Sequence, residues 1–124
     1  VHAALEAGLH PIICVGESLE QKKIGITNEV VCLQTKAALA GVTSAQIADV
    51  VIAYEPVWSI GPGKTPADKA YIQKIAAFVK EKTGGMDIVY GGGLKQENAA
   101  MLASIDDIDG GLIALTRFQG QMEL

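Results

Sequence analysis

Apolar residues gather in short runs along the chain, and turn residues such as glycine lie between these runs. The runs are continuous and rich in valine and isoleucine rather than alternating with polar residues. Such runs are typical of strands buried on both faces of a parallel sheet. The pattern predicts four strands, at residues 11–15, 50–54, 88–90 and 112–115.

Helical patterns separate the predicted strands. The opening residues, VHAALEAG, have the pattern of the last turns of a helix. Thr27 is predicted to cap a second helix that stops at Gly41, and the capping-box sequence at residues 65–68 to open a third that stops at Gly84. A fourth, shorter helix is predicted over residues 95–104. The predicted buried faces of the second and third helices comprise Val30, Leu33, Ala37 and Ala40, and Tyr71, Ile75, Phe78 and Val79.

This alternation of helix and strand predicts a parallel α/β fold with right-handed crossovers, either a doubly wound sheet or a (β/α) barrel. A complete eight-stranded barrel takes ~250 residues, so four strands in 124 residues would form half of one. No linker stands out, which predicts one domain over residues 1–124. Because the chain starts on Val1 rather than methionine, we expect it to be a piece of a larger protein.

The composition of the chain argues against some classes of binding partner. The formal net charge is −4, and no basic stripe is present that could follow a phosphate backbone, so nucleic acid is not an expected partner. A membrane is not expected either, because no apolar stretch is long enough to span one. Cys14 and Cys32 lie inside apolar runs without metal-like spacing, which predicts two reduced, buried thiols in a cytosolic protein and no metal site.

The sequence YEPVWSIGPGKT at residues 54–65 carries the strongest candidate chemistry. It is not a Walker phosphate loop, because Trp58 stands where that motif requires its first glycine. Glu55 directly follows an apolar strand, where partial desolvation strengthens a carboxylate as a general base; the alternative is a solvated carboxylate at a strand exit. Pro56 and the glycines at 61 and 63 suit a hinged lid that excludes water.

Residues 91–93, three consecutive glycines after the third strand, suit either an anion-binding nest of N–H groups or a plain turn. Three motifs together then resemble one known family: ICVGESLEQ at residues 13–21, AYEPVWSIGPGKT at residues 53–65 and IVYGGG at residues 88–93. They stand in the order and spacing of the C-terminal half of triosephosphate isomerases, and the resemblance covers essentially the whole chain. It implies half of a TIM (β/α)8 barrel, with roughly its last four βα units and without the final helix.

The resemblance also implies roles. Glu55 is expected to move a proton between adjacent carbons of a triose phosphate through an enediolate, under a lid formed by residues 56–65. Glu17 is expected to accept a hydrogen bond from Trp58. Phosphate contacts are expected at Gly61, Gly92 and Gly93. The expected lid and hinge residues are Pro56, Val57, Trp58, Ile60, Gly63, Lys64 and Thr65, and the expected supporting residues are Glu17, Cys14 and Tyr90.

The chain departs from the family pattern in several places. The family's catalytic lysine and electrophilic histidine have no counterpart, since His2 and His10 are expected at the wrong end of the strands. Ser59 and Pro62 replace other residues in the lid. Gly93 replaces a serine, and Ala114-Leu115 replace a glycine pair, so phosphate recognition is expected to be rebuilt. Arg117 has the planar fork to grip phosphate oxygens there, or else it is a surface residue paired with an acid.

The sequence therefore predicts a cofactor-independent aldose–ketose isomerase of the cytoplasm. It would act on a small phosphorylated sugar and form a homodimer when complete, whereas the 124 residues alone are expected to be inactive and to self-associate. Two alternatives stay open: an isomerase of another small sugar phosphate, such as a tetrulose phosphate, and a non-catalytic anion-binding half-barrel.

Overall fold

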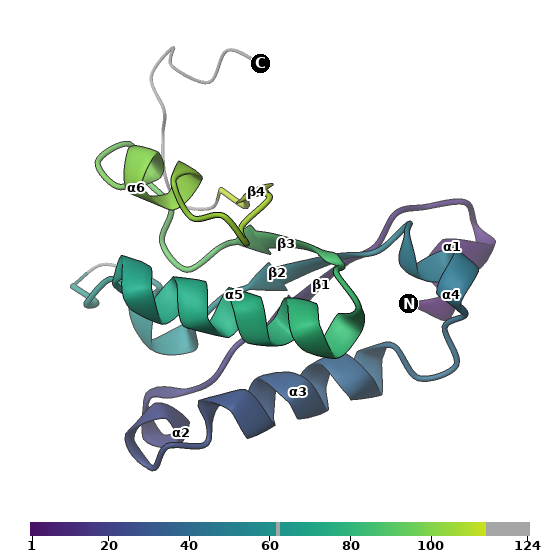
Figure 1. The fold of residues 1–124 in the computed structure, drawn as a ribbon, viewed down its shortest axis with the longest axis horizontal. Coiled ribbons are helices and arrows are strands. Elements are labelled where there is room, and N and C mark those ends of the chain that lie inside the picture. The colour runs from purple at the N-terminus through teal and green to yellow at the C-terminus, as the bar shows by residue number, and fades with distance from the viewer. Residues whose placement is uncertain (62, 114–124) are drawn as a thin grey trace.

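The computed structural model describes residues 1–61 and 63–113, and it contains one four-stranded parallel sheet (Figure 1). The strands pair in sequence order, which confirms the predicted α/β class and is the arrangement of a partial (β/α)8 barrel. The register places Cys14 beside Ala53, Ala53 beside Val89, and Val89 beside Gly110. The strands are β1 (Ile12–Val15), β2 (Val51–Tyr54), β3 (Asp87–Tyr90) and β4 (Gly110–Gly111).

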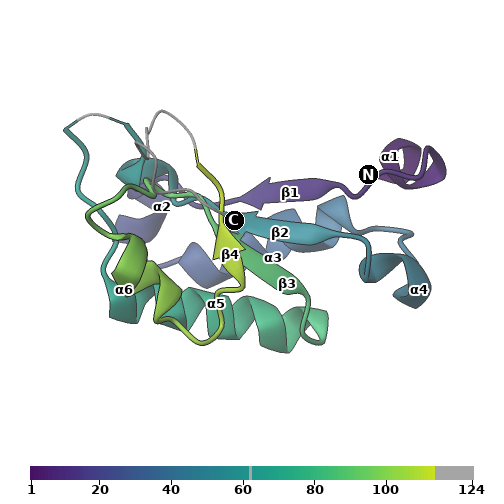
Figure 2. The ribbon, with the colours of Figure 1, turned by 90° about the horizontal axis from the view of Figure 1, so that it is seen from above.

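Two long helices, α3 (Thr27–Ala38) and α5 (Lys69–Thr83), lie side by side on one face of the sheet (Figures 1 and 2). The strands point their carboxyl ends toward α2, while α1 and α4 lie at the opposite end (Figure 2). The shorter helices are α1 (His2–Glu6), α2 (Leu19–Lys23), α4 (Ser44–Ile47), α6 (Ala99–Ala103) and the 3-10 turn η1 (Val57–Ser59).

The hydrophobic core fills the layer between the sheet and the two long helices. Its fully buried side chains alternate along β2 and β3, where Ile52 and Tyr54 pack beside Ile88 and Tyr90. This burial of apolar surface holds the sheet onto the helices. The helices contribute Val31, Ile72, Ile75, Ala76 and Val79.

The prediction that every strand is buried on both faces is wrong for β1. Ile12 is 53% exposed, and Cys14 is exposed rather than buried as expected. The cause is the one-sided layering, because α3 and α5 cover one face and Ile12 and Cys14 point to the other. Cys32, on α3, is half-buried.

The predicted inward stripe of α3 is also wrong, since Leu33 is 69% exposed and the buried positions are Thr27, Val31 and Thr35. The hydropathy pattern did not reveal this buried face, because two of its three residues are threonines. Thr35 is tolerated inside because its hydroxyl donates to the carbonyl of Val31 at 2.8 Å. Thr27 is the first helical residue rather than the cap.

Several predicted boundaries shift. Helix α5 starts at Lys69, because the carboxylate of Asp68 caps it by accepting from the N–H of Tyr71 at 2.8 Å; its end at Gly84 is as predicted. Helix α6 starts at Ala99 rather than Lys95, where the N–H of Lys95 is held by the side chain of Asn98. Helices α2 and α4 were not predicted, although Ser18–Gln21 and Thr43–Gln46 form capping boxes.

The fourth strand pairs with β3 at Gly110 and Gly111, two residues before the predicted start. The N–H of Asp109 donates to the carbonyl of Ile88 at 2.7 Å, and the N–H of Leu112 to that of Tyr90 at 2.9 Å. Hydropathy did not mark this start, because glycine carries no apolar side chain. Residues 114 and 115 of the predicted strand lie outside the described residues.

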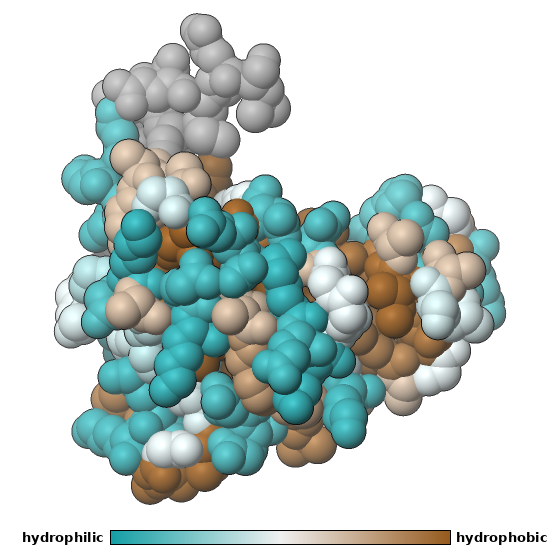
Figure 3. Space-filling view, in the orientation of Figure 1, coloured by the Kyte–Doolittle hydropathy of each residue, from teal (hydrophilic) through white to brown (hydrophobic). Residues whose placement is uncertain are grey.

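Apolar side chains also reach the surface, as the brown region over α1 and α4 shows (Figure 3). Large exposed apolar residues occur elsewhere as well, in β1, α3, the region around α2, the loop before β1 and η1, namely Leu9, Ile12, Leu19, Ile24, Leu33 and Val57. Of the helices that the structure describes, none has both the length and the apolar character needed to cross a membrane.

Candidate active site

Glu55 lies directly after β2, at the carboxyl end of the sheet and on its open face. Its backbone N–H donates to the carbonyl of Val15 at 2.7 Å, which ties it to the end of β1. Two glycines flank it at the same level of the sheet. A β-carbon at Gly16 would lie 1.8 Å from the carbonyl oxygen of Glu55, and one at Gly91 would lie 2.7 Å from its Oε1. Only glycine fits at Gly16, where the contact is with backbone, and a side chain at Gly91 would displace the half-buried carboxylate of Glu55.

Cys14 lies beside Glu55 on the open face. Although Cys14 is exposed as a residue, partial desolvation raises the pKa of its thiol, and so do the negative charge of Glu55 and a hydrogen bond between the thiol and that carboxylate. The thiol therefore stays protonated and able to donate to Glu55 at neutral pH. The structure thus brings together two residues that the sequence placed in the site for separate reasons.

The root of the predicted lid is well anchored. Pro56 is fully buried, and the N–H of Val57 donates to the backbone carbonyl of Glu17 at 3.0 Å. Ser59 is 5% exposed, and its hydroxyl lies 2.8 Å from the carbonyl of Pro56 and 2.9 Å from the carbonyl of Gly92. Ser59 therefore joins the lid root to the glycine loop at residues 91–93.

The glycine loop is held from within as well. The N–H of Gly91 donates to the carbonyl of Tyr54 at 2.9 Å, so it is part of the sheet and not of an anion-binding nest. The hydroxyl of Tyr90 donates to the carbonyl of Gly92 at 2.9 Å, and the amide of Asn98 to the carbonyl of Gly93 at 3.0 Å. These bonds fix the backbone of Gly92 and Gly93, the predicted phosphate contacts.

The tip of the lid is exposed. Gly61 and Gly63 have φ angles of +102° and +74°, and open space surrounds both. The N–H of Lys64 lies 3.4 Å from the carbonyl of Gly61, and Lys64 and Thr65 are exposed. Ile60, at the junction with the root, is half-buried. The lid thus has a fixed root and a tip that extends into solvent.

A buried carboxylate lies under the lid root. Glu17 is fully buried and accepts hydrogen bonds from the indole N–H of Trp58 at 2.9 Å, as predicted, and from the hydroxyls of Tyr54 and Tyr71. A buried carboxylate requires such donors, because burying a charge without partners costs far more than the roughly 2–7 kcal/mol for a neutral polar group. Burial and then the charge of Glu17 raise the pKa of Tyr54, and burial and then the bond to Glu17 raise the pKa of Tyr71 to about 12. Both hydroxyls therefore remain donors at neutral pH.

Sequence reasoning missed three residues of this site. Ser59 was marked only as a departure from the family pattern, and that departure was the available signal. Tyr71 was taken for a core residue of α5, and nothing in the sequence connects it to Glu17, 54 residues away. Lys22 lies over the rings of Trp58 and Tyr71, at 4.5 and 5.4 Å from their centroids, and its place at the end of α2 was not predicted.

Other predicted residues lie elsewhere. His2 is in α1, where its ring contacts the carbonyl of Ala40 at 2.7 Å, and His10 pairs with Asp49 at 3.6 Å. Both are at the end of the sheet opposite to Glu55, as expected (Figure 2). Arg117 lies outside the described residues, as do Pro62 and the pair Ala114-Leu115.

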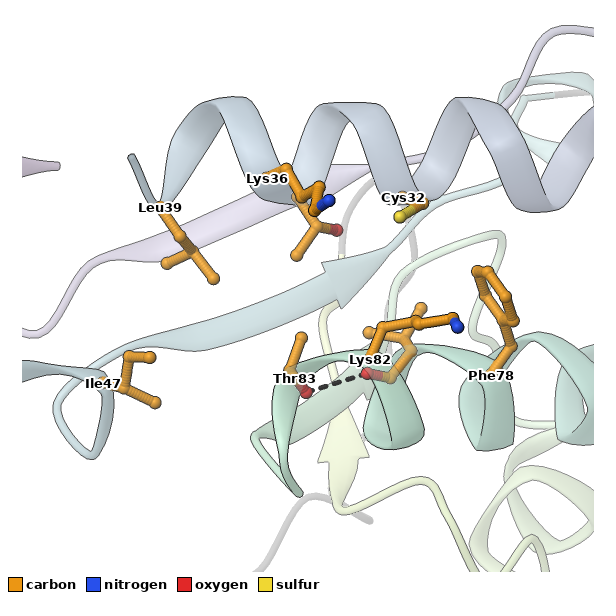
Figure 4. Close-up of a pocket in the computed structure, with 9 residues that line it drawn as sticks. Cys32, Lys36, Leu39, Ile47, Phe78, Lys82 and Thr83 are labelled. Atoms are coloured by element: carbon orange, nitrogen blue, oxygen red, sulfur yellow. Dashed lines mark hydrogen bonds between the residues drawn. The ribbon is translucent and has the colours of Figure 1, made fainter. Parts of the chain in front are cut away.

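The molecule also has a hollow of about 420 Å³ between α3 and α5 (Figure 4). Cys32 and Lys36 of α3 face Phe78 and Lys82 of α5 across it (Figure 4). It contains none of the predicted site residues and lies in the helix layer, so we place the active site at the strand ends. Within residues 1–61 and 63–113, no cluster of three or more His, Cys, Asp or Glu side chains is arranged to hold a metal ion.

Comparison with known proteins agrees with this geometry. The model of one protein family, triosephosphate isomerase, matches residues 1–121. The chain is similar to a triosephosphate isomerase of Thermoanaerobacter sp. (strain X514), with 49% identity over 121 residues that cover 91% of this chain and 49% of the relative. It is 50% identical over 118 residues to that of Cupriavidus pinatubonensis, covering 89% of this chain and 48% of the relative. The chain spans about half the length of the curated relatives it matches.

Proposed function

Because this chain belongs to the triosephosphate isomerase family, we propose that it carries the catalytic base and the lid of an isomerase that interconverts dihydroxyacetone phosphate and glyceraldehyde 3-phosphate. The observation that supports this proposal most is the position of Glu55. It lies at the carboxyl end of a parallel strand and at the root of a lid, with its backbone carbonyl against Gly16 and its carboxylate against Gly91. In this class of fold, catalytic groups lie at that end of the strands.

In the proposed reaction, the carboxylate of Glu55 removes a proton from the carbon next to the carbonyl of the sugar phosphate. The resulting enediolate is then protonated on the adjacent carbon by the same group, while a proton passes from the oxygen of the first carbon to that of the second, which converts ketose to aldose. The oxygen-to-oxygen transfer is proposed to need the family's electrophile, which has no counterpart in these 124 residues. A carboxylate that is held in place and covered by a lid suits this step, because the lid excludes water that would otherwise compete for the proton. The backbone of Gly92 and Gly93 and the N–H of Gly61 are the proposed phosphate contacts.

The proposal includes further residues for the complete enzyme. The electrophile and the catalytic lysine that the family uses have no counterpart here, and the chain spans about half of its relatives. We therefore propose that the 124 residues alone show no turnover. The complete enzyme is proposed to be a cytoplasmic homodimer that needs no cofactor.

A second candidate is an isomerase of a larger sugar phosphate, such as a tetrulose phosphate. Gly93 favours it, because the family's serine hydroxyl is missing there, and φ at this residue is +97°, which is unfavourable for serine. The sequence also has Ala114-Leu115 in place of the family's glycine pair, at positions outside the described residues. In this proposal Arg117 grips the phosphate in their place.

The test is an isomerase assay of the complete enzyme with triose and tetrulose phosphates. Glu55→Asp shortens the side chain by about one bond, and a misplacement of that order lowers kcat by ~10²-fold. We expect this loss with whichever substrate is turned over, together with unchanged circular dichroism. An unchanged kcat would remove Glu55 from the role of base. Phosphate binding without turnover of either substrate would instead favour a non-catalytic anion-binding half-barrel.

A further inference from the structure

The contacts of the lid root point to a role for one residue of α5. We propose that Tyr71 is a positioning residue, which fixes the indole of Trp58, and with it the root of the lid, through the carboxylate of Glu17. The proposal rests on the proposed function in treating residues 56–65 as a lid beside the base. The contacts that carry it do not depend on which sugar phosphate the enzyme uses.

The first step is the coordination of Glu17. This fully buried carboxylate accepts hydrogen bonds from three side chains in three different elements. Tyr54 belongs to β2, Trp58 to η1 and Tyr71 to α5. Tyr71 is thus the donor that ties the carboxylate to the long helix, outside the sheet and the lid. Since a buried carboxylate holds its place only when its oxygens are satisfied, the hydroxyl of Tyr71 helps to fix the acceptor that Trp58 uses.

The second step is the direction of the Tyr71 hydroxyl. It lies 3.0 Å from the hydroxyl of Thr27, the first residue of α3, and also bonds to Glu17. A hydroxyl has one proton, and an ionised carboxylate only accepts. Tyr71 therefore donates to Glu17 and accepts from Thr27. The contact with α3 aims the Tyr71 proton at the carboxylate.

The third step is the direct contact between the rings. Trp58 and Tyr71 pack edge to face, with centroids 5.6 Å apart and an interplanar angle of 78°. The ammonium group of Lys22 lies over both rings, at 4.5 Å from the Trp58 centroid and 5.4 Å from the Tyr71 centroid. Edge-to-face and cation–π contacts are both attractive in this geometry. The indole is thus held at its N–H and by its ring from α2 and α5.

The fourth step connects this contact to the base. Trp58 follows Glu55 by three residues, and the N–H of Val57 between them donates to the backbone carbonyl of Glu17. A shift of the indole would therefore move the chain next to the base. The expected effect is on the placement of Glu55, and so on kcat more than on substrate affinity.

Trp58 is the only tryptophan of the chain, so its fluorescence reports on this contact directly. The variant Tyr71→Phe keeps the ring and removes the hydroxyl. In this variant we expect acrylamide quenching of Trp58 fluorescence to rise about twofold, because the indole leaves its contact with Glu17 and becomes exposed more often. In Tyr71→Leu, which also removes the ring contact, the rise should be larger. In the complete enzyme, Tyr71→Phe should lower kcat about tenfold and leave KM within about twofold.

The matched control is Thr35→Val, which removes another hydroxyl bond of the helix layer far from Trp58 and should leave quenching unchanged. Unchanged quenching in Tyr71→Phe, or KM changing as much as kcat, would overturn the proposal. If Tyr71→Phe does not fold, Thr27→Val decides instead: raised quenching supports the proposal and unchanged quenching overturns it. A complete enzyme without isomerase activity would contradict the proposed function, while quenching would still decide the role of Tyr71.

Discussion

At residue 59 the family pattern has alanine and at residue 93 serine, whereas this chain has serine and glycine there. Ser59 places a hydroxyl in the lid root, 2.9 Å from the carbonyl of Gly92 in the glycine loop. This hydroxyl therefore orients the backbone of the loop.

We predict that Ser59→Ala raises KM for the sugar phosphate with a smaller effect on kcat. The loss is limited to about fivefold, because one hydrogen bond is worth about 1 kcal/mol and the hydroxyl of Tyr90 still holds the same carbonyl. Steady-state kinetics of the complete enzyme measure it. Ser104→Ala, which removes a hydroxyl that bonds within its own helix end, is the control. An unchanged KM in Ser59→Ala would show that this bond does not shape the phosphate site.

The residues that the sequence identified in this site are those with local signals. Glu55 follows an apolar strand, whereas the hydrogen bond between Glu17 and Trp58 was implied by the resemblance of their two motifs to the family. Tyr71 could not be found in this way, because on its helix it has the spacing of an ordinary core residue. Its role depends on a contact between α5 and the end of β1, which exists only in the folded chain.

At the scale of elements, Asp109 joins α5 to β3 and to the start of β4. Its Oδ2 accepts from the ammonium group of Lys80 at 2.7 Å and from the N–H of Ile88 at 2.9 Å. Lys80 also donates to the carbonyl of Met86 at 3.0 Å. Burial raises the pKa of Asp109, but the bond and charge of Lys80 and the N–H of Ile88 outweigh it and hold the pKa below 3.8.

A carboxylate whose pKa is lowered by folding stabilises the fold above its unfolded pKa, and this stabilisation is lost as pH falls through its folded pKa. We therefore predict that Asp109→Asn destabilises the chain at neutral pH, by about 1 kcal/mol because the group is partly exposed. The difference from the parent should shrink as pH falls through the lowered pKa of Asp109, because the group is then protonated in the folded state as well as in the unfolded one. Urea unfolding at neutral pH and at a pH below this pKa measures it. An equal difference at the two values would mean that the charge of Asp109 contributes nothing.

The sequence predicted the helices and strands correctly where the buried side chains are also the apolar ones. Three strands and α5 follow from continuous apolar runs and from a helical stripe of Ile75 and Val79. The buried face of α3 was not predictable from hydropathy, because it contains Thr27 and Thr35. These polar residues are buried because their hydroxyls form hydrogen bonds inside the protein. The start of β4 was missed because backbone pairing, rather than side chains, defines it.

At the scale of the whole molecule, the helices within residues 1–61 and 63–113 cover the sheet on one face only (Figure 1). The layering leaves Ile12 and Cys14 of β1 exposed, and β1 is also the edge strand of the described sheet. An open strand edge and an apolar face are both sites of association in water. On the other side, α3 and α5 form the helix layer, where Leu33 is exposed.

We predict that the 124-residue chain alone self-associates through this open face, with a second copy as the occupant. Light scattering of the purified chain should give a mass above 13.0 kDa that rises with concentration. Ile12→Lys places a charge on the open face, where desolvating it opposes association, so the mass should fall toward that of the monomer. Leu33→Lys makes the same change at a comparably exposed residue of the helix layer and should leave the mass unchanged. A stable, well-folded monomer of the parent chain would contradict the prediction, and an equal response to both substitutions would place the contact elsewhere.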